Sequence, residues 1–287
     1  MNFLRLTCWV CLWLAPSFVR AQSIVLQAPE LNESSGIAQI GQQLWSHNDS
    51  GDGPRFFVFQ KSGELLGKVE IEGAKAFDWE DMCSFTRHGK QYVAVGDVGD
   101  NPSGRKDVQI YAIEIPEELS AANSRFEKNW TLSVTAEFRV TYPGGAVDCE
   151  TLAYDPLTES FVLASKELFR CRIFSVPAAR LDGRQNAEAH LIGTVVLPLV
   201  SGGDISPDGS RLVLTTYGPG ALVNRRLTSG SEQQPATTWL IDGEGAVKML
   251  ELPARKQGES VCFSNDGQKL WLTSEHVPTP LIEVKVP

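Results

Sequence analysis

Five polar residues occupy the same place in five similar segments of the sequence, and their side chains could do chemistry together. They are Ser35, Glu80, Glu150, Ser201 and Glu259. Each begins a short strand-like run that is followed, after a turn, by a second apolar run. Two carboxylates about 5 Å apart repel by roughly 3 kcal/mol at an effective dielectric of about 20. Three such groups brought together would therefore take up protons or a cation.

Oxygen atoms alone make up this set, because it contains no histidine and no cysteine. Such ligands favour a hard cation, and a loose ring of carboxylates and hydroxyls suits calcium better than magnesium. We therefore predict one calcium ion held by the five residues. Two alternatives stay open, namely another ion and a water-filled channel in which the glutamates are simply hydrated.

A second set follows the second apolar run of each segment and would lie one strand outward from the first. Its members are Asp49, Asp97, Lys166, Tyr217 and Glu275. Asp49 and Asp97 stand on glycine-flanked turns and are candidate general bases, and Lys166 would neutralise developing negative charge. We predict these three as catalytic residues. Ordinary turn chemistry remains the alternative for each loop taken singly.

These residues can meet only if the five segments surround a common axis. Each segment carries strand-like runs separated by turn residues, such as the Ser-x-Asp-Gly turns at Ser206–Gly209 and Ser264–Gly267. The last segment lacks one strand, and Ser23–Gln27 at the other end of the chain can supply it. Four strands per unit, closed in this way, predict an all-β, five-bladed β-propeller whose N-terminal strand pairs with the last blade.

The spacing of the five segments is uneven, at 45, 70, 51 and 58 residues. Six blades remain possible if residues 101–147 form a blade of their own, and an irregular β-sandwich is a further alternative. We expect one strand at Thr131–Val140 and one short helix at Glu117–Arg125. In the fourth unit we expect the two outer strands at Thr237–Ile241 and Ala246–Leu252.

Residues 1–21 have the parts of an export signal: Arg5, an apolar run, and small-residue spacing at Val19 and Ala21. We predict cleavage before Gln22, a single domain at 22–287, and a secreted or periplasmic product with no membrane span. An uncleaved membrane anchor is the alternative.

Charge and cysteine content narrow the functional classes. The chain has 26 basic and 35 acidic residues and a net charge of −9, which becomes −11 without Arg5 and Arg20. No basic stripe is present, so we predict no nucleic-acid binding. The cysteines of 22–287 lie inside predicted strands, and we expect small buried apolar residues rather than disulfides. They are Cys83, Cys149, Cys171 and Cys262.

The order Ser, Glu, Glu, Ser, Glu in the first set resembles that of the calcium-activated nucleotidases, the secreted apyrases. The turn Asn48–Gly51 is similar to an acidic turn that contributes to their active site. The strings Asp78–Asp81 and Gly96–Asn101 resemble those of a group of uncharacterised bacterial secreted propellers. This resemblance implies a five-bladed propeller that holds one calcium ion.

Two functional hypotheses follow. In the first, the protein is a secreted calcium-dependent hydrolase that acts on a small polar substrate at the channel mouth, phosphate-type or else a glycoside or lactone. In the second, it is a non-catalytic module with a structural calcium ion, and its outer loops bind a surface partner.

Overall fold

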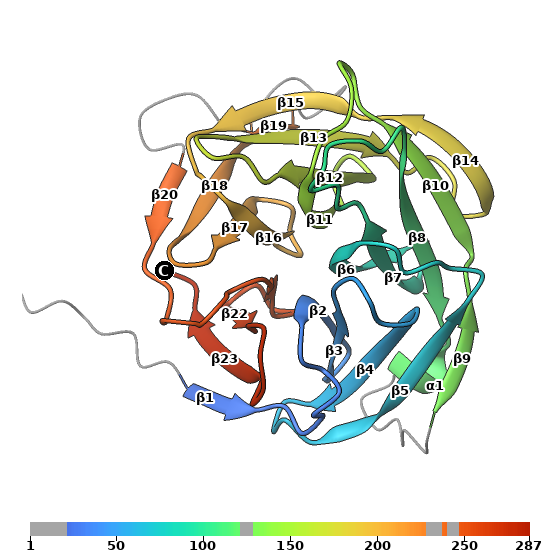
Figure 1. The fold of residues 1–287 in the computed structure, drawn as a ribbon, viewed down its shortest axis with the longest axis vertical. Helices are drawn as coiled ribbons and strands as arrows, with labels where there is room; N and C mark the ends of the chain where they lie inside the picture. The colour runs from blue at the N-terminus through green and yellow to red at the C-terminus, as the bar shows by residue number, and fades with distance from the viewer. Residues whose placement is uncertain (1–21, 121–128, 228–236, 240–246) are drawn as a thin grey trace, which may run out of the picture.

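The computed structural model describes residues 22–120, 129–227, 237–239 and 247–287, which form five β-sheets around a central axis (Figure 1). The prediction of an all-β, five-bladed propeller is confirmed. Blade 1 contains β2 (Ser34–Ile40), β3 (Gln43–Asn48), β4 (Arg55–Gln60) and β5 (Leu65–Glu72). Blade 2 contains β6 (Trp79–Arg87), β7 (Lys90–Asp97), β8 (Val108–Ile115) and β10 (Ala136–Thr141).

The remaining blades follow the same antiparallel order. Blade 3 contains β11 (Cys149–Asp155), β12 (Ser160–Ser165), β13 (Cys171–Pro177) and β15 (His190–Val195). Blade 4 contains β16 (Val200–Ile205), β17 (Arg211–Thr216), β18 (Gly220–Leu227), β19 (Thr237–Trp239) and β20 (Val247–Leu250). Blade 5 contains β21 (Val261–Phe263), β22 (Lys269–Leu272), β23 (Pro280–Lys285) and, from the other end of the chain, β1 (Gln22–Val25).

The ring closes as predicted, because β1 is the outermost strand of blade 5. It pairs antiparallel with β23, from Gln22 opposite Glu283 to Val25 opposite Pro280. Beyond the strand, Leu26 and Leu31 are buried in a cluster with side chains of blades 1 and 5. The N-terminal segment therefore covers the edge of blade 5 and fills the core between the first and last blades.

Two strands pair with the blade before the one to which their preceding strand belongs. The predicted strand Thr131–Val140 is wrong as a single element, because it divides into β9 (Trp130–Ser133) and β10, and β9 pairs in parallel with β5 of blade 1. Similarly, β14 (Gly183–Glu188) pairs in parallel with β10 of blade 2. These exchanged strands cover the outer edges of blades 1 and 2. The six-blade alternative fails, since residues 101–147 supply strands to these two blades.

Blade 4 differs from the expected strand order. Its third strand is β18, which the sequence analysis missed, and both β19 and β20 pair with it. The apolar run of β18 ends at the polar residues Asn224–Arg226, yet the guanidinium of Arg225 is buried and pairs with Asp155 of blade 3. Because its charged residue is buried in an ion pair with another blade, β18 does not show the apolar pattern by which a strand is predicted from sequence.

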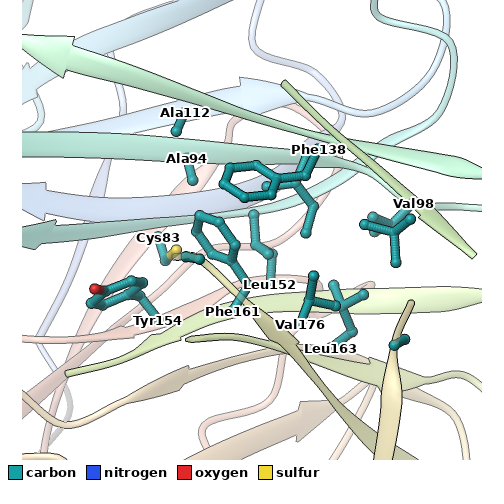
Figure 2. Packing of buried hydrophobic residues seen from close by; sticks show 14 of the residues in the cluster. Cys83, Ala94, Val98, Ala112, Phe138, Leu152, Tyr154, Phe161, Leu163 and Val176 are labelled. Carbon is teal, nitrogen blue, oxygen red and sulfur yellow. The ribbon is translucent and has the colours of Figure 1, made fainter. Parts of the chain in front are cut away.

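Buried apolar side chains fill the spaces between the blades. Figure 2 shows one such cluster, in which Phe138 of blade 2 packs against Phe161 of blade 3 with ring centroids 5.2 Å apart. Cys83 is part of the same cluster. As expected, the four cysteines of the described chain are buried and unpaired.

The helix α1 (Glu117–Ser120) covers the start of the predicted helix, and residues 121–125 lie outside the described residues. At four residues it is too short to cross a membrane, and no other helix occurs in the described ranges. The predicted export signal at 1–21 also lies outside the described residues.

Removal of β1 should destabilise the ring, because blade 5 would lose its outer strand and expose the edge of β23. We expect a chain that starts at Leu26 to melt at least about 10 °C below one that starts at Gln22, the shift for a loss of a few kcal/mol in a domain of this size. Differential scanning calorimetry and limited proteolysis measure the difference. Equal melting temperatures would show that β1 does not hold the ring closed.

Candidate metal site at the channel mouth

The residues of the first set are placed by a recurring irregularity in the first strand of each blade. In blade 1, Ser34 lies opposite Asn48 and Gly36 lies opposite His47, so Ser35 is an extra residue without a partner across the ladder. The same shift occurs in blades 2, 3 and 4 at Glu80, Glu150 and Ser201. A β-bulge of this kind re-aims a side chain next to a site.

Glu259 completes the set from blade 5, two residues before β21. All five side chains are buried, at 1–3% exposure. The structure therefore removes from solvent all five residues that the sequence predicts as metal ligands.

The three glutamates of the set influence one another strongly. Burial raises the pKa of Glu80 well above its usual value, and the negative charge of Glu150 raises it further. Burial likewise raises the pKa of Glu150 to about 7, although Lys166 opposes this shift. The pKa of Glu259 rises to about 8, through burial first and then the charge of Glu150. The three carboxyl groups thus share one poorly solvated region.

The two serines link neighbouring blades. The Ser35 hydroxyl donates a hydrogen bond to the Glu80 carbonyl oxygen at 2.5 Å. The Ser201 hydroxyl donates to the Gly258 carbonyl oxygen at 2.7 Å. Each hydroxyl hydrogen is used in this way, while the lone pairs of the oxygen stay available to a cation.

Asp78, which the sequence analysis did not assign to the site, also belongs to it. Single carboxylate oxygens of Asp49, Asp78 and Glu80 all lie within 4.8 Å of one another. Asp78 stands two residues before Glu80, and the same offset gives Glu33 in blade 1, Asp148 in blade 3 and Gln257 in blade 5. Mostly polar residues at this repeated offset were the signal that could have revealed it.

Burial affects the two aspartates as it does the glutamates. It raises the pKa of Asp49, and the charge of Glu33 adds to the effect. The pKa of Asp78 rises to about 6, through burial first and then the charge of Asp49. Both groups therefore titrate closer to neutrality than ordinary aspartates do.

Lys166 brings a positive charge to these carboxylates, at the end of the central channel that we call the mouth. Its Nζ atom lies 2.8 Å from Glu150 Oε1 and 5.5 Å from the centroid of the Tyr217 ring. Burial by itself would lower the pKa of Lys166, but Glu150 and Tyr217 outweigh it and raise the pKa above its usual value. Lys166 is thus held charged beside Glu150, and its predicted catalytic role stays a prediction.

Asp97 does not occupy the position predicted for it. The backbone N–H of Asp49 bonds to Glu33 O and that of Lys166 to Asp148 O, whereas in blade 2 Gly99 makes this bond, to Asp78 O. The alignment of Asp97 with the second set is therefore wrong, because the turn after β7 places Gly99 at that point.

The side chain of Asp97 is buried, and both of its oxygens accept hydrogen bonds. Arg105 Nη1 donates to Asp97 Oδ1 at 2.8 Å, and the backbone N–H groups of Phe77 and Asp78 donate to its two oxygens at 3.3 and 3.2 Å. Asp97 thus holds the segment that carries Asp78.

Two observations show that these residues fit a hard cation. Glu259 Oε2 is buried and has no hydrogen-bond partner, while Glu259 Oε1 accepts from Gln257 at 3.0 Å. At Gly99 a Cβ atom would come within 2.2 Å of Glu80 Oε1 and 2.5 Å of Asp78 Oδ2, so the absence of a side chain lets the backbone lie directly against these two carboxylates. An unsatisfied carboxylate oxygen and carboxylates packed this closely are what a bound cation would satisfy.

No protein-family model and no curated protein matches the sequence. Among solved structures, a gluconolactonase of Xanthomonas campestris is 12% identical, with 88% of this chain and 72% of that chain covered and a TM-score of 0.44. A Thermus thermophilus protein assigned to the oxidoreductases as a glucose dehydrogenase is 10% identical, with 93% and 99% covered and a TM-score of 0.48. A luciferin-regenerating enzyme is 11% identical, with 92% and 96% covered and a TM-score of 0.44. At these values the likenesses carry no argument about the mouth.

The raised pKa values predict how stability depends on pH when cations are removed. Folded Glu150 and Glu259 hold protons up to about pH 7 and 8, whereas the unfolded chain releases them near 4.5. The free energy of unfolding in chelator should therefore fall as the pH rises from about 5 to about 8. Thermal melts across this range measure it.

Glu259→Gln should flatten this dependence, because one of the titrating groups is removed. Glu188→Gln, at an exposed position on β14, should keep the wild-type slope. A melting temperature in chelator that rises between pH 5 and 8 would contradict the predicted carboxylate cluster.

Proposed function

We propose that this protein is a calcium-dependent hydrolase that binds a small polar substrate at the acidic channel mouth. The observation that carries the proposal is the cluster of Asp49, Asp78 and Glu80, whose carboxylate oxygens lie within 4.8 Å of one another, with the buried Glu150 acting on Glu80 and Glu259, and with Glu259 Oε2 left unpartnered. Glu80, Glu150 and Glu259 would hold the ion, with the oxygens of Ser35 and Ser201 as further ligands. When bound, calcium supplies a positive charge that polarises the substrate oxygen.

The charges of the mouth restrict the substrate. Carboxyl groups outnumber basic groups there, because Glu33, Asp148 and Glu275 add to the three glutamates, Asp49 and Asp78, whereas the basic groups that interact with this set are Lys166, Arg105 and Arg255. One divalent ion does not compensate this excess, so the repulsion of an anionic substrate grows with its charge and is strongest for a polyphosphate. We therefore infer that the phosphate-type substrate is the one least opposed, a phosphodiester with a single negative charge.

Asp49 is the best general base of the site. Burial raises its pKa, which brings the carboxylate closer to the range in which a base is effective at neutral pH. In the proposed reaction a water oxygen forms a bond to phosphorus while the bond from phosphorus to the leaving oxygen breaks. Asp49 takes a proton from the water, and this proton then passes to the leaving oxygen.

Lys166 and Asp97 have different roles in this proposal. The Lys166 ammonium, held by Glu150, would neutralise the negative charge that develops on the phosphoryl oxygens. Asp97 is assigned a positioning role, because Arg105 and two backbone N–H groups occupy its oxygens.

A non-catalytic module is the second candidate. The burial of the glutamates favours this second candidate. An ion bound at residues only 2–3% exposed would join blades 2, 3 and 5 and stabilise the fold even if no substrate bound at the surface. Both candidates share the ion and differ in turnover. In either case we propose a secreted or periplasmic protein, on the export-signal pattern of residues 1–21.

Calcium should raise the melting temperature, because an ion that binds only the folded chain stabilises it by mass action. At about a hundred times the Kd the gain is about 2.7 kcal/mol. The double variant Glu80→Gln/Glu150→Gln should fold and lose this gain, while Glu188→Gln keeps it. Thermal melts with calcium and with chelator, together with elemental analysis, provide the measurement.

Gly99→Ala tests the same site without the removal of a carboxylate. Its Cβ atom would displace the oxygens of Glu80 and Asp78, so the calcium-dependent shift should shrink. A wild-type protein that contains no metal and does not respond to chelator would refute the ion.

Asp49→Asn should lower kcat at least about a hundredfold on a phosphodiester substrate, the usual scale for the loss of a general base, with the calcium-dependent melting shift retained. Asp182→Asn, an exposed aspartate between β13 and β14, is the matched control and should leave kcat unchanged. Full turnover by Asp49→Asn would place the chemistry elsewhere. If no phosphodiester, glycoside or lactone is hydrolysed while calcium binds, the non-catalytic module is the correct function.

A further inference from the structure

Large apolar side chains are exposed around the acidic mouth. Among the described residues, ten large apolar side chains are strongly exposed, and six of them belong to the segments that form the mouth. We call these six the apolar rim: Phe77, Leu168, Phe169, Val196, Tyr217 and Val277. Phe77 is 70% exposed and Phe169 is 82% exposed. Single exposed apolar residues are ordinary on protein surfaces, but a gathering of them marks an interaction site.

Two rim residues contact charged side chains near the site, and a third stands close to Lys166 in the sequence. Phe77 immediately precedes Asp78, and the Arg105 guanidinium carbon lies 5.2 Å from the centroid of its ring. The Tyr217 ring centroid lies 5.5 Å from Lys166 Nζ. Phe169 stands three residues after Lys166, in the turn between β12 and β13.

The other rim residues extend the surface across blades 3 to 5. Leu168 shares the turn of Phe169, and the segment of Val196 lies against this turn because Leu199 N donates to Glu167 O at 2.8 Å. Val277 stands two residues after Glu275, whose carboxyl group interacts with the charge of Asp49. The rim therefore follows the mouth through blades 2, 3, 4 and 5.

The site is polar in the centre and apolar at the edge, which fits a ligand that has both a polar part and an apolar part. A fully hydrated substrate gains nothing from exposed phenylalanine and leucine, whereas an alkyl or aryl group laid on them leaves water. An anionic lipid surface would bring many negative charges against the excess of carboxylates at the centre, whereas a small molecule brings only one, which favours a soluble small molecule. The charge of the centre and the apolar surface of the rim thus indicate a small molecule that has one polar part and one apolar part.

We propose that the substrate is amphiphilic: its singly charged phosphodiester group enters the acidic mouth, and an apolar substituent lies on the rim. This inference rests on the proposed hydrolase function, because it concerns the other part of the same substrate. Phe77, Phe169 and Tyr217 are then specificity-determining residues, and none of them takes part in the chemical step.

The test is a series of alkyl 4-nitrophenyl phosphates, from methyl to hexyl, that share one reacting group. We expect kcat/KM to rise about two- to fourfold for each methylene that reaches the rim, up to the gain from full burial of a CH2 group. The variant Phe77→Ser/Phe169→Ser should lower kcat/KM for the hexyl ester about tenfold and leave the methyl ester unchanged. Leu191→Ser, at an exposed position on the outer strand β15, should behave as wild type.

Binding provides a readout that does not depend on turnover. Alkyl 4-nitrobenzylphosphonates carry a P–C bond in place of the bond to the leaving group, and calorimetry should show the same rise of affinity with chain length. If no ester is hydrolysed but the phosphonates show this rise and lose it in the double variant, the hydrolase proposal fails and the rim is supported.

The opposite result would overturn the inference alone. Hydrolysis and binding that are independent of chain length would leave the proposed hydrolase in place without an apolar substituent. Rim-dependent binding to phosphatidylcholine vesicles, or rim-dependent dimerisation in analytical ultracentrifugation, without any effect of chain length would likewise overturn it and identify a lipid surface or a second copy of the chain as the occupant.

Discussion

Mutual repulsion of buried carboxylates at the axis is the constraint on which the rest of this structure depends. Glu80, Glu150 and Glu259 come from three blades, and each lies where burial opposes its charge. A ring that holds such groups together must resist its own opening. The closure by β1 and the exchanged strands β9 and β14 provide part of this resistance, because they join successive blades through backbone hydrogen bonds.

Two further carboxylates, placed deeper, act as clamps between the blades. Asp81 Oδ2 accepts hydrogen bonds from Leu152 N at 3.1 Å and from Gly203 N at 3.2 Å, so blade 2 is tied to blades 3 and 4. Asp204 Oδ2 accepts from Phe263 N at 2.8 Å and ties blade 4 to blade 5. Burial raises the pKa of both groups, yet each hydrogen bond to a backbone N–H favours the ionised form. Carboxylates therefore repel one another at the mouth, whereas Asp81 and Asp204 join the blades through backbone hydrogen bonds.

The fold could be predicted because a repeat places equivalent residues at equivalent positions, and the ring residues followed from it. Local backbone geometry could not be predicted. Nothing in the sequence shows that Ser35 or Glu80 is a bulge residue, and the turn that brings Gly99 rather than Asp97 to the mouth depends on a local detail of the chain. The strand β18 was missed because Arg225 is buried against Asp155, a partner from another blade. The apolar rim was equally hidden, since an apolar residue in a sequence is expected to be inside.

Lys166 bears on how the proposed cation site could also accept an anion. Its ammonium neutralises Glu150 at the surface side of the ring, and that contact keeps its own charge in a partly buried position. An ion bound to the remaining carboxylates would lie beside a fixed positive charge, and the two together would offset part of the repulsion that the surrounding acids exert on a negative group. In the proposed function, a preference for a singly charged group would then arise from the balance of charges already present in the chain.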